Sequence, residues 1–337
     1  ATALPETVGS AGLTFQPDDP VDLARQLRRV LAKKTTIVRE NSKRLFRIAV
    51  VACRYGAEVL GGAERSLRTI AESLHAAGHA VEVFSTCTHH DGAWCNELQE
   101  GTTVEEGLAV HRFPIARRDE TVYARCAAEI AMTNGAVVEK VENGFLDNSI
   151  HSPALIAALA ERSREFDAII AGPYLFGLLC EVARVFPDKT LLLPCFHDEP
   201  EAHLSIFQKS YGNVAGILYH SAEEQHFAEA QLGINHPNGV VLGTYLADTP
   251  AASTAIGHEA VGGERPYFVY CGRYSNEKEL PTLIEWARRY NETHLGRFTF
   301  AFVGKGAVPI PREAWARDLG FVDEATKRAI LAGSAGL

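Results

Sequence analysis

The segment Arg54–Arg65, R-Y-G-A-E-V-L-G-G-A-E-R, joins a short apolar run to a helical pattern through two adjacent glycines. The preceding run, Phe46–Cys53, is apolar and β-branched, which is typical of a strand buried on both faces of a parallel sheet. Glycine at such a turn lets a ligand approach the backbone, and the N–H groups in the first turn of a helix favour anions. Gly61-Gly62 therefore predicts contact with a phosphate or sugar, although two glycines can also make no more than a tight turn. The spacing is not the G-x-G-x-x-G of dinucleotide sites.

Two further polar segments follow apolar runs. His197-Asp198 comes after a run that ends near Cys195, and Gly272–Lys278, G-R-Y-S-N-E-K, comes after a run that ends at Cys271. The guanidinium and ammonium groups of the second segment are suited to neutralising a phosphate, but a charged turn is more often only solvated. A single histidine beside a strand is likewise more often structural. A metal site in H-D-E-P-E-A-H is disfavoured, because the spacing differs from H-E-x-x-H and a proline interrupts the helix.

Alternating strand-like and helical segments must position these residues. From Phe46 to Leu242 the alternation predicts a parallel sheet covered on both faces, whose ligands bind at the carboxyl ends of the strands. Gly61-Gly62 and His197 both fall at such ends. One long helix is expected over Tyr123–Val141.

The composition changes near residue 244. Residues 244–265 are rich in Ala, Thr, Gly and Pro, which predicts an interdomain linker, and the strand-turn-helix pattern then recurs. We predict an α/β fold of two Rossmann-like, doubly wound parallel-sheet domains. They comprise residues 46–243 and an incomplete second domain at 266–337, and an N-terminal extension occupies residues 1–45.

The overall composition is that of an ordinary soluble protein, with 337 residues, 46% hydrophobic and 22% charged. A net charge of −9 argues against a nucleic-acid partner. No apolar run approaches the roughly 18 residues that a transmembrane helix needs, and the N-terminus lacks a signal-peptide pattern, so we expect a cytoplasmic protein. The seven cysteines form no C-x-x-C pair, which favours reduced core residues over a metal site or disulfide framework.

The N-terminal extension carries a concentration of positive charge. Residues 21–47 contain nine basic and two acidic residues, a local charge of +7. Apolar residues share one helical face here, at Leu23, Leu27, Val30 and Leu31. A basic amphipathic helix can bind peripherally to an anionic membrane, here the inner face of the cell membrane. A solvated linker, or a helix packed on the first domain, is the alternative.

Five segments, taken in order, resemble the glycosyltransferases of family 4, which have the two-domain GT-B fold. They are G-G-A-E at 61–64, H-D at 197–198, G-R-x-x-x-E-K at 272–278, F-V-G-K-G at 302–306 and L-G-F-V-D-E-A-T-K at 319–327. The resemblance extends from Phe46 to the C-terminus. It implies a nucleotide-diphosphate sugar as donor substrate, no cofactor, and a glycan, lipid-linked or surface-polysaccharide precursor as acceptor.

The resemblance also implies how the donor is bound. Gly272, Arg273 and Lys278 would hold the diphosphate, and Gly61 and Gly62 would bring backbone N–H groups toward it from the other domain. The sequence contains no D-x-D pair, which argues against the metal-dependent single-domain glycosyltransferases. Neutralisation of the diphosphate by side chains fits a metal-independent reaction.

The remaining site residues follow from the same resemblance. His197, together with Asp198, would lie beside the transferred sugar, where His197 contributes a hydrogen bond as the oxocarbenium-like centre forms. Arg54, Tyr55 and Glu64 would belong to the acceptor side. The resemblance further implies retention of configuration by attack on the face from which the diphosphate leaves, so that no pair of carboxylates is needed as in retaining glycosidases.

One departure from the family pattern concerns the second domain. The family's P-S-x-Y-E-S stretch and its two glutamates eight positions apart have no counterpart before Leu337. We therefore expect a fragment of the active enzyme, with an exposed apolar face on the second domain. A non-catalytic acceptor-binding or scaffolding module is the alternative, and a Rossmann-type oxidoreductase is disfavoured because no dinucleotide motif follows any strand. Acceptor specificity is expected in the loops 88–106 and 117–129.

Overall fold

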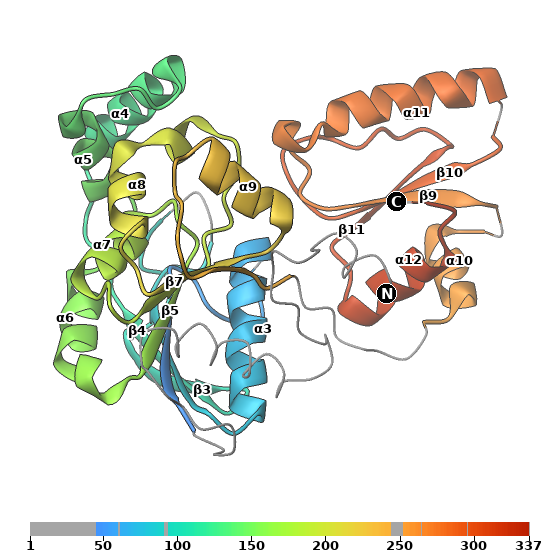
Figure 1. Ribbon diagram of the computed structural model, residues 1–337. Coiled ribbons are helices and arrows are strands. Elements are labelled where there is room, and N and C mark those ends of the chain that lie inside the picture. Colours follow the sequence, from blue (N-terminus) through green and yellow to red (C-terminus); the bar gives the residue numbers. More distant parts are fainter. Residues whose placement is uncertain are drawn as a thin grey trace. The chain divides into compact units, whose positions relative to one another are not determined.

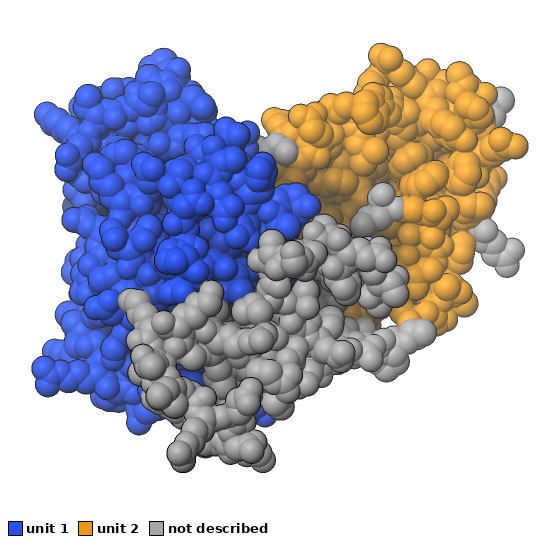
Figure 2. All heavy atoms as spheres, in the orientation of Figure 1, with its two compact units in different colours: residues 1–247 blue, residues 248–337 orange. Residues whose placement is uncertain are grey.

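A computed structural model describes residues 45–336, apart from residues 60, 91–93, 244–251, 264 and 295. The chain forms two compact units, and the boundary between residues 247 and 248 falls inside the predicted linker (Figure 2). Residues 1–44 lie outside the described part of the chain, and they include nearly all of the predicted N-terminal extension and its basic amphipathic helix. No helix among the described residues is long and apolar enough to cross a membrane.

The first unit is built on an eight-stranded sheet with the order β3-β4-β2-β1-β5-β6-β7-β8 (Figure 1). Every neighbouring pair is parallel except β3 and β4. Central strand β1 pairs on both sides, with Val50 opposite Val83 and Ile170. The strands are β1 (Arg47–Ala52), β2 (Ala80–Thr86), β3 (Gly101–Glu105), β4 (Leu108–Phe113), β5 (Ala168–Gly172), β6 (Thr190–Leu192), β7 (Gly216–Tyr219) and β8 (Gly239–Val241).

Helices cover both faces of this sheet. The helices are α3 (Gly62–Ala76), α4 (Glu120–Thr133), α5 (Glu139–Asp147), α6 (Pro153–Arg162), α7 (Gly177–Val185), α8 (Ser205–Tyr211) and α9 (Ala222–Ala230), with the 3-10 turns η1 (Ser163–Glu165) and η2 (Pro200–His203). Val50 of β1 lies in one core cluster with Leu67 of α3. The next residue, Val51, lies in another cluster with Leu159 of α6 and Leu178 of α7. Strand β1 is therefore buried on both faces, as its continuous apolar sequence predicted.

Strand β3 departs from the predicted parallel sheet, because it pairs with β4 in an antiparallel hairpin. The connecting residues Glu106 and Gly107 have φ values of 49° and 82°, as a tight two-residue hairpin turn requires. This strand occupies the end of the predicted loop 88–106. Its β-branched T-T-V sequence and the following Glu-Gly turn are the signal that could have identified it.

The long helix predicted over Tyr123–Val141 is wrong, because two helices, α4 and α5, occupy this region. Helix α4 ends at Thr133; its C-cap residue, Asn134, is left-handed with a φ of 49°, and Gly135 follows with a φ of 78°. A Cβ atom on Gly135 would lie 2.4 Å from the carbonyl oxygen of Pro200. The Asn-Gly pair thus ends the helix and lets η2 approach the backbone closely.

The second unit contains a parallel three-stranded sheet with the order β11-β10-β9. Helix α11 lies on one face of this sheet, and α10 and α12 lie on the other (Figure 1). The elements are α10 (Thr254–Val261), β9 (Tyr267–Cys271), the 3-10 turn η3 (Asn276–Lys278), α11 (Leu280–His294), β10 (Thr299–Val303), β11 (Ala316–Gly320) and α12 (Glu324–Gly333).

Helix α10 corrects the linker prediction for residues 254–261. The helix belongs to the second unit and packs on α12, and a Cβ atom on Gly257 would lie only 2.1 Å from the carbonyl oxygen of Ala329. The Ala- and Gly-rich sequence that suggested a linker instead lets the two helices approach closely. Small side chains weakened the periodic signal that usually reveals a helix.

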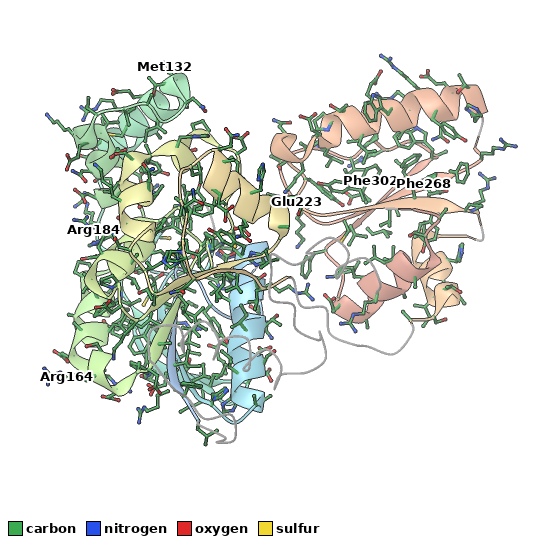
Figure 3. All side chains as sticks on the ribbon, in the orientation of Figure 1. Met132, Arg164, Arg184, Glu223, Phe268 and Phe302 are labelled. Carbon is green, nitrogen blue, oxygen red and sulfur yellow. The ribbon has the colours of Figure 1, made fainter. Side chains whose placement is uncertain are left out.

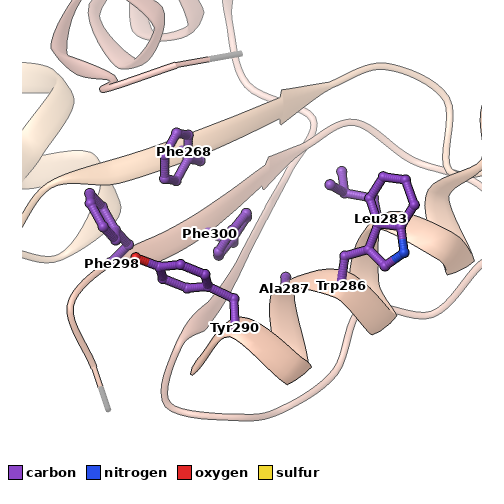
Figure 4. Close-up of a pocket in the computed structure, with 7 residues that line it drawn as sticks. All are labelled: Phe268, Leu283, Trp286, Ala287, Tyr290, Phe298 and Phe300. Atoms are coloured by element: carbon purple, nitrogen blue, oxygen red, sulfur yellow. The ribbon is translucent and has the colours of Figure 1, made fainter. Parts of the chain in front are cut away.

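An apolar groove of about 430 Å³ lies between α11 and the strands of the second unit. It is lined by Phe268, Leu283, Trp286, Ala287, Tyr290, Phe298 and Phe300 (Figure 4). Trp286 is 66% exposed at this groove, so apolar surface of the second unit is open to solvent there. The residues after α12 form backbone hydrogen bonds with β9. The N–H of Ala335 donates to the carbonyl of Tyr267 (2.8 Å), and the N–H of Val269 donates to the carbonyl of Gly336 (3.0 Å).

Candidate functional site

The two glycines at the start of α3 have different surroundings. Gly61 is the N-cap residue, with an extended φ of 169°, and a Cβ atom there would lie 2.0 Å from a carboxylate oxygen of Glu64. A Cβ atom on Gly62 would meet nothing within 4 Å among the described residues. Gly61 therefore lies directly against the Glu64 carboxylate, whereas Gly62 leaves open space at the helix N-terminus.

The carboxylate beside Gly61 belongs to a buried ion pair. Arg54 donates from Nε to Oε1 of Glu64 (3.0 Å), and its Nη2 donates to the same oxygen. The two side chains are only 6% and 11% exposed, and the Arg54 guanidinium lies 5.5 Å from the centre of the Trp94 ring. The positive end of the α3 dipole thus faces a carboxylate of the protein itself, which Arg54 neutralises.

Tyr55, the third predicted acceptor-side residue, is buried at 3% exposure in the core cluster beside α3. Its hydroxyl has no hydrogen-bond partner among the described residues, and burial raises its pKa well above the ordinary tyrosine value. Its carbonyl oxygen accepts a hydrogen bond from Nη2 of Arg112 (3.1 Å). This position favours a packing role for the Tyr55 side chain.

His197 and Asp198 lie in the loop that follows β6, and both are exposed. Oδ1 of Asp198 is 3.3 Å from Nε2 of His203, and the Asp198 side chain is 82% exposed. The structure therefore directs Asp198 toward His203. Two residues before His197, Cys195 has a φ of 56°, a left-handed conformation that is rare outside glycine.

Three buried or partly buried carboxylates hold this loop and the start of the α8 helix that follows it, and none was predicted from the sequence. Oε1 of Glu224 accepts the N–H of Phe196 (2.7 Å), Oε1 of Glu199 accepts the hydroxyl of Tyr174 (2.5 Å), and Glu142 accepts the N–H of Ser205 (2.5 Å). A signal was present only for the first, since S-A-E-E at 221–224 has the spacing of a helix N-terminal capping box.

The Gly61 turn and the His197 loop lie at the same edge of the first sheet, at the carboxyl ends of β1 and β6. Burial raises the pKa of the Cys195 thiol, and the charges of Glu224 and then Glu64 add to this effect. In the sheet, β5 lies between β1 and β6 and pairs in parallel with both, so the two predicted segments follow the carboxyl ends of strands separated by one neighbour. The structure thus places both predicted segments of the first unit at one edge of its sheet.

In the second unit the predicted turn is held against the loop after β10. A Cβ atom on Gly304, which has a φ of 148°, would lie 1.9 Å from the carbonyl oxygen of Gly272. A Cβ atom on Gly306 would lie 2.1 Å from the carbonyl oxygen of Tyr274, whose N–H donates to the carbonyl of Lys305 (2.9 Å). The glycines of G-K-G are therefore needed because the two backbones touch.

Arg273 and Lys278 project from this turn and are exposed. The hydroxyl of Tyr270 donates to the carbonyl of Arg273 (2.6 Å), which fixes the start of the turn, and Lys278 ends η3. Next to the turn is a pocket of about 440 Å³, lined by Ser275, Asn276, Pro281, Ile284, Ala307, Val308 and Pro309. Two cations beside a pocket of this size, at the carboxyl edge of a parallel sheet, suit an anionic small molecule.

No group of three or more His, Cys, Asp and Glu side chains that could hold a metal ion occurs among the described residues. Cys53, Cys87, Cys126 and Cys180 are buried, as expected of core cysteines, while Cys95 and Cys271 are exposed. The expectation of core cysteines is therefore wrong for Cys95 and Cys271, and Cys271 directly precedes the turn that begins at Gly272.

No protein-family model and no curated protein matches the sequence. Solved structures do match. A sucrose-phosphate synthase from Thermosynechococcus elongatus is 12% identical, with a TM-score of 0.55 over 86% of this chain and 74% of the other. Anabaena HepE in complex with UDP and glucose is 14% identical, with a TM-score of 0.54 over 86% and 72%. An E. coli structure described as trehalose-6-phosphate, bound with UDP-2-fluoro glucose, is 12% identical, with a TM-score of 0.52 over 86% and 77%.

The structural neighbours are GT-B glycosyltransferases. The chain itself is α/β, with one eight-stranded and one three-stranded sheet, and it has a GT-B type fold of two Rossmann-like units. The fold expected from the sequence is therefore confirmed.

Proposed function

We propose that this protein is a glycosyltransferase that transfers a sugar from a nucleotide-diphosphate donor. The observation that carries the proposal is the turn Gly272–Lys278, which backbone contacts with Gly304 and Gly306 hold beside a pocket. Two structural neighbours have donor-like ligands, UDP with glucose and UDP-2-fluoro glucose, which supports a donor of this class. Membership of glycosyltransferase family 4, which the sequence motifs suggest, is a more specific part of this proposal.

The donor diphosphate binds to Arg273 and Lys278 in this proposal. A guanidinium fork holds two phosphate oxygens in fixed geometry, and a flexible ammonium follows the charge as it grows on the leaving group. The pocket that includes Ser275 and Asn276 accommodates the nucleoside part. Charge neutralisation by these side chains makes the reaction independent of a divalent metal.

The sugar is transferred with retention of configuration. The acceptor hydroxyl attacks the anomeric carbon on the face from which the diphosphate leaves, the bond from carbon to the phosphate oxygen breaks, and the departing phosphate oxygen takes the hydroxyl proton. His197, exposed at the end of β6, donates a hydrogen bond to the transferred sugar. Gly62 contributes its backbone N–H to the donor in this proposal, since a Cβ atom there would meet nothing within 4 Å among the described residues.

The acceptor is a glycan or a lipid-linked saccharide in this proposal. The turn that carries the buried Arg54–Glu64 pair lies on the acceptor side in this proposal. The predicted specificity loops 88–106 and 117–129 are only partly loops, because residues 101–105 form β3 and residues 120–129 belong to α4. Peripheral membrane contact through residues 21–47 would suit a lipid-linked acceptor in the cytoplasm. Flotation with anionic vesicles, with and without residues 1–45, measures this contact, and equal binding of both forms would exclude it.

Calorimetric titration with UDP, GDP and ADP tests the donor site. Arg273→Ala and Lys278→Ala should each weaken binding of the preferred nucleotide by about 1.5–3 kcal/mol, the range for hydrogen bonds to charged groups. Arg289→Ala is a matched control, because Arg289 is 73% exposed on α11, nine residues after Leu280 and so roughly 14 Å along the helix.

Transfer from the bound nucleotide sugar is then measured with and without EDTA. Equal rates are expected, and loss of activity that Mg²⁺ restores would contradict metal independence. Nucleotide binding without transfer to any acceptor would favour a non-catalytic module. Wild-type affinity in both the Arg273 and Lys278 variants would remove their proposed role.

A further inference from the structure

Glu224 lies at the third position of α9, one turn after its N-cap residue, Ser221. The Ser221 hydroxyl accepts the N–H of Glu224 (3.1 Å), which is half of a capping box. In the usual capping box the glutamate would accept the N–H of Ser221 in return. Here its carboxylate instead reaches the backbone of the loops after β6 and β7.

Each oxygen of this carboxylate binds a different loop. Oε1 accepts the N–H of Phe196 (2.7 Å), and Oε2 accepts the N–H of His220 (2.6 Å). The Glu224 side chain is only 7% exposed, so it is a buried charge. A buried carboxylate is stable only when hydrogen bonds satisfy it, and these two bonds fix both loops relative to α9.

The hydrogen bond from Phe196 to Glu224 holds the residue that directly precedes His197. Phe196 is 6% exposed and packs its ring 4.9 Å from the ring of Tyr174, whereas His197 is exposed. Cys195 immediately precedes Phe196 and has a left-handed φ of 56°. Such a strained conformation is maintained only where the surrounding structure enforces it. The backbone therefore has little freedom immediately before His197.

The other side of His197 is held in a similar way. The hydroxyl of Tyr174 donates to Oε1 of Glu199 (2.5 Å), and the N–H of Glu199 donates to the carbonyl of His197 (3.0 Å). Tyr174 is 1% exposed. An exposed histidine thus lies between two points at which buried side chains immobilise the loop.

We infer that Glu224, and Tyr174 on the other side of the loop, are positioning residues for His197 in the transfer reaction. This inference rests on the proposed function, in which His197 contacts the transferred sugar. Glu224 and Tyr174 act through the loop backbone and not on the substrate, so they set the place of the His197 imidazole. A displacement of about 1 Å at a reacting centre is enough to lower a rate by about 100-fold.

The test is a double-mutant cycle between Glu224→Gln and His197→Ala. The amide that replaces the Glu224 carboxylate can accept through one atom only, so one of the two backbone N–H groups loses its acceptor. Glu224→Gln should lower kcat about 10- to 100-fold and leave KM for the nucleotide sugar within twofold. Glu223→Gln, at the exposed neighbouring position of α9 (Figure 3), is the matched control and should leave kcat unchanged.

In the His197→Ala background, Glu224→Gln should change kcat by less than twofold, because its effect passes through His197. A further 10- to 100-fold loss of kcat would overturn the inference, because a general structural defect would lower kcat independently of His197 and the two effects would add. If Glu224→Gln does not fold, Tyr174→Phe replaces it in the cycle with the same two outcomes.

A separate readout distinguishes failure of this inference from failure of the proposed function. The His197 imidazole signal is assigned in a ¹H–¹³C spectrum as the signal that His197→Ala removes. Glu224→Gln should shift this signal and Glu223→Gln should not, even if the protein transfers no sugar. An unchanged signal would overturn the positioning of His197 by Glu224.

Discussion

The polar side chains that hold the strand-end loops of the first unit are buried and hydrogen-bonded, whereas the cationic side chains of the second unit are exposed on a turn that backbone contacts hold. Arg54, Glu64 and Glu224 exemplify the first arrangement, and Arg273 and Lys278 the second. Geometry in the first unit therefore depends on the pairing of charges. Geometry in the second depends on glycine, because two chain segments approach more closely than any Cβ atom allows.

The largest expected effect comes from adding a Cβ atom where the second unit's loops touch. Gly304→Ala should lower the free energy of unfolding of that unit by about 3–5 kcal/mol, since overpacking and a strained φ act together. Trp286 and Trp315 fluorescence during urea unfolding, in a Trp94→Phe background, reports on this unit. Gly320→Ala is the control, because its φ of 62° is also positive but its Cβ atom would meet nothing within 4 Å. Equal effects of both variants would refute the close approach.

Breaking the buried ion pair should have the next largest effect, in the first unit. Glu64→Ala should destabilise this unit by about 3 kcal/mol, because it removes the carboxylate that pairs with the buried Arg54 guanidinium. Trp94 fluorescence in a Trp286→Phe, Trp315→Phe background measures the change. Adding Arg54→Met should recover much of the loss. If Glu64→Ala alone is neutral, the pair does not stabilise the first unit.

A smaller effect is expected from the partly buried charge network on β2. Arg162 donates to both oxygens of Glu82 (2.7 and 2.9 Å), and this hydrogen bonding, followed by that of His111, lowers the pKa of Glu82. A carboxylate with a lowered folded pKa stabilises the protein above its unfolded pKa of about 4.3, and this stabilisation is lost as the pH falls through the folded pKa. Glu82→Gln should therefore cost about 1–2 kcal/mol at pH 7 and much less near pH 3. Urea unfolding across this range is the measurement, and Glu285→Gln on the second unit's surface should show a weaker pH dependence.

The smallest change in stability is expected at the apolar groove of the second unit. Trp286→Ser should alter the free energy of unfolding by less than about 0.5 kcal/mol, because the side chain is 66% exposed. The variant should nevertheless bind less of the dye ANS, which reports exposed apolar surface. Val138→Ser removes a comparably exposed side chain from the first unit, 67% exposed, and should leave dye binding unchanged. A loss of more than about 2 kcal/mol in Trp286→Ser would show that the groove is part of a closed core.

Sequence periodicity predicted elements best where burial is strongest. The central strand β1 and helix α3 were predicted because both faces of the strand, and one face of the helix, are apolar. The helix over Tyr123–Val141 failed because the apolar period continues across Asn134-Gly135, although the backbone turns there. Helix α10 was missed because its small side chains serve close packing and leave little hydrophobic signal.

For the candidate site, the structure tests where the predicted residues lie along the sheet and not what they do. Gly61-Gly62 and His197 lie at strand ends, as expected, but Gly61 accommodates Glu64, and Asp198 is directed toward His203. The roles of the predicted donor residues stay predictions. Side-chain directions could not be predicted because they depend on which loops the sheet order makes adjacent.

The sequence by itself determined the α/β organisation into two units and the placement of polar turns after apolar strands. These properties are encoded locally, by the period of apolar residues and by glycine at helix starts. Only the tertiary structure decided which side chains hold those turns in place. Glu224 and Phe196 are 28 residues apart, and their hydrogen bond exists because β6 and β7 are neighbours in the sheet. Strand order depends on the packing of the whole unit, so no local pattern around His197 could have revealed its anchor.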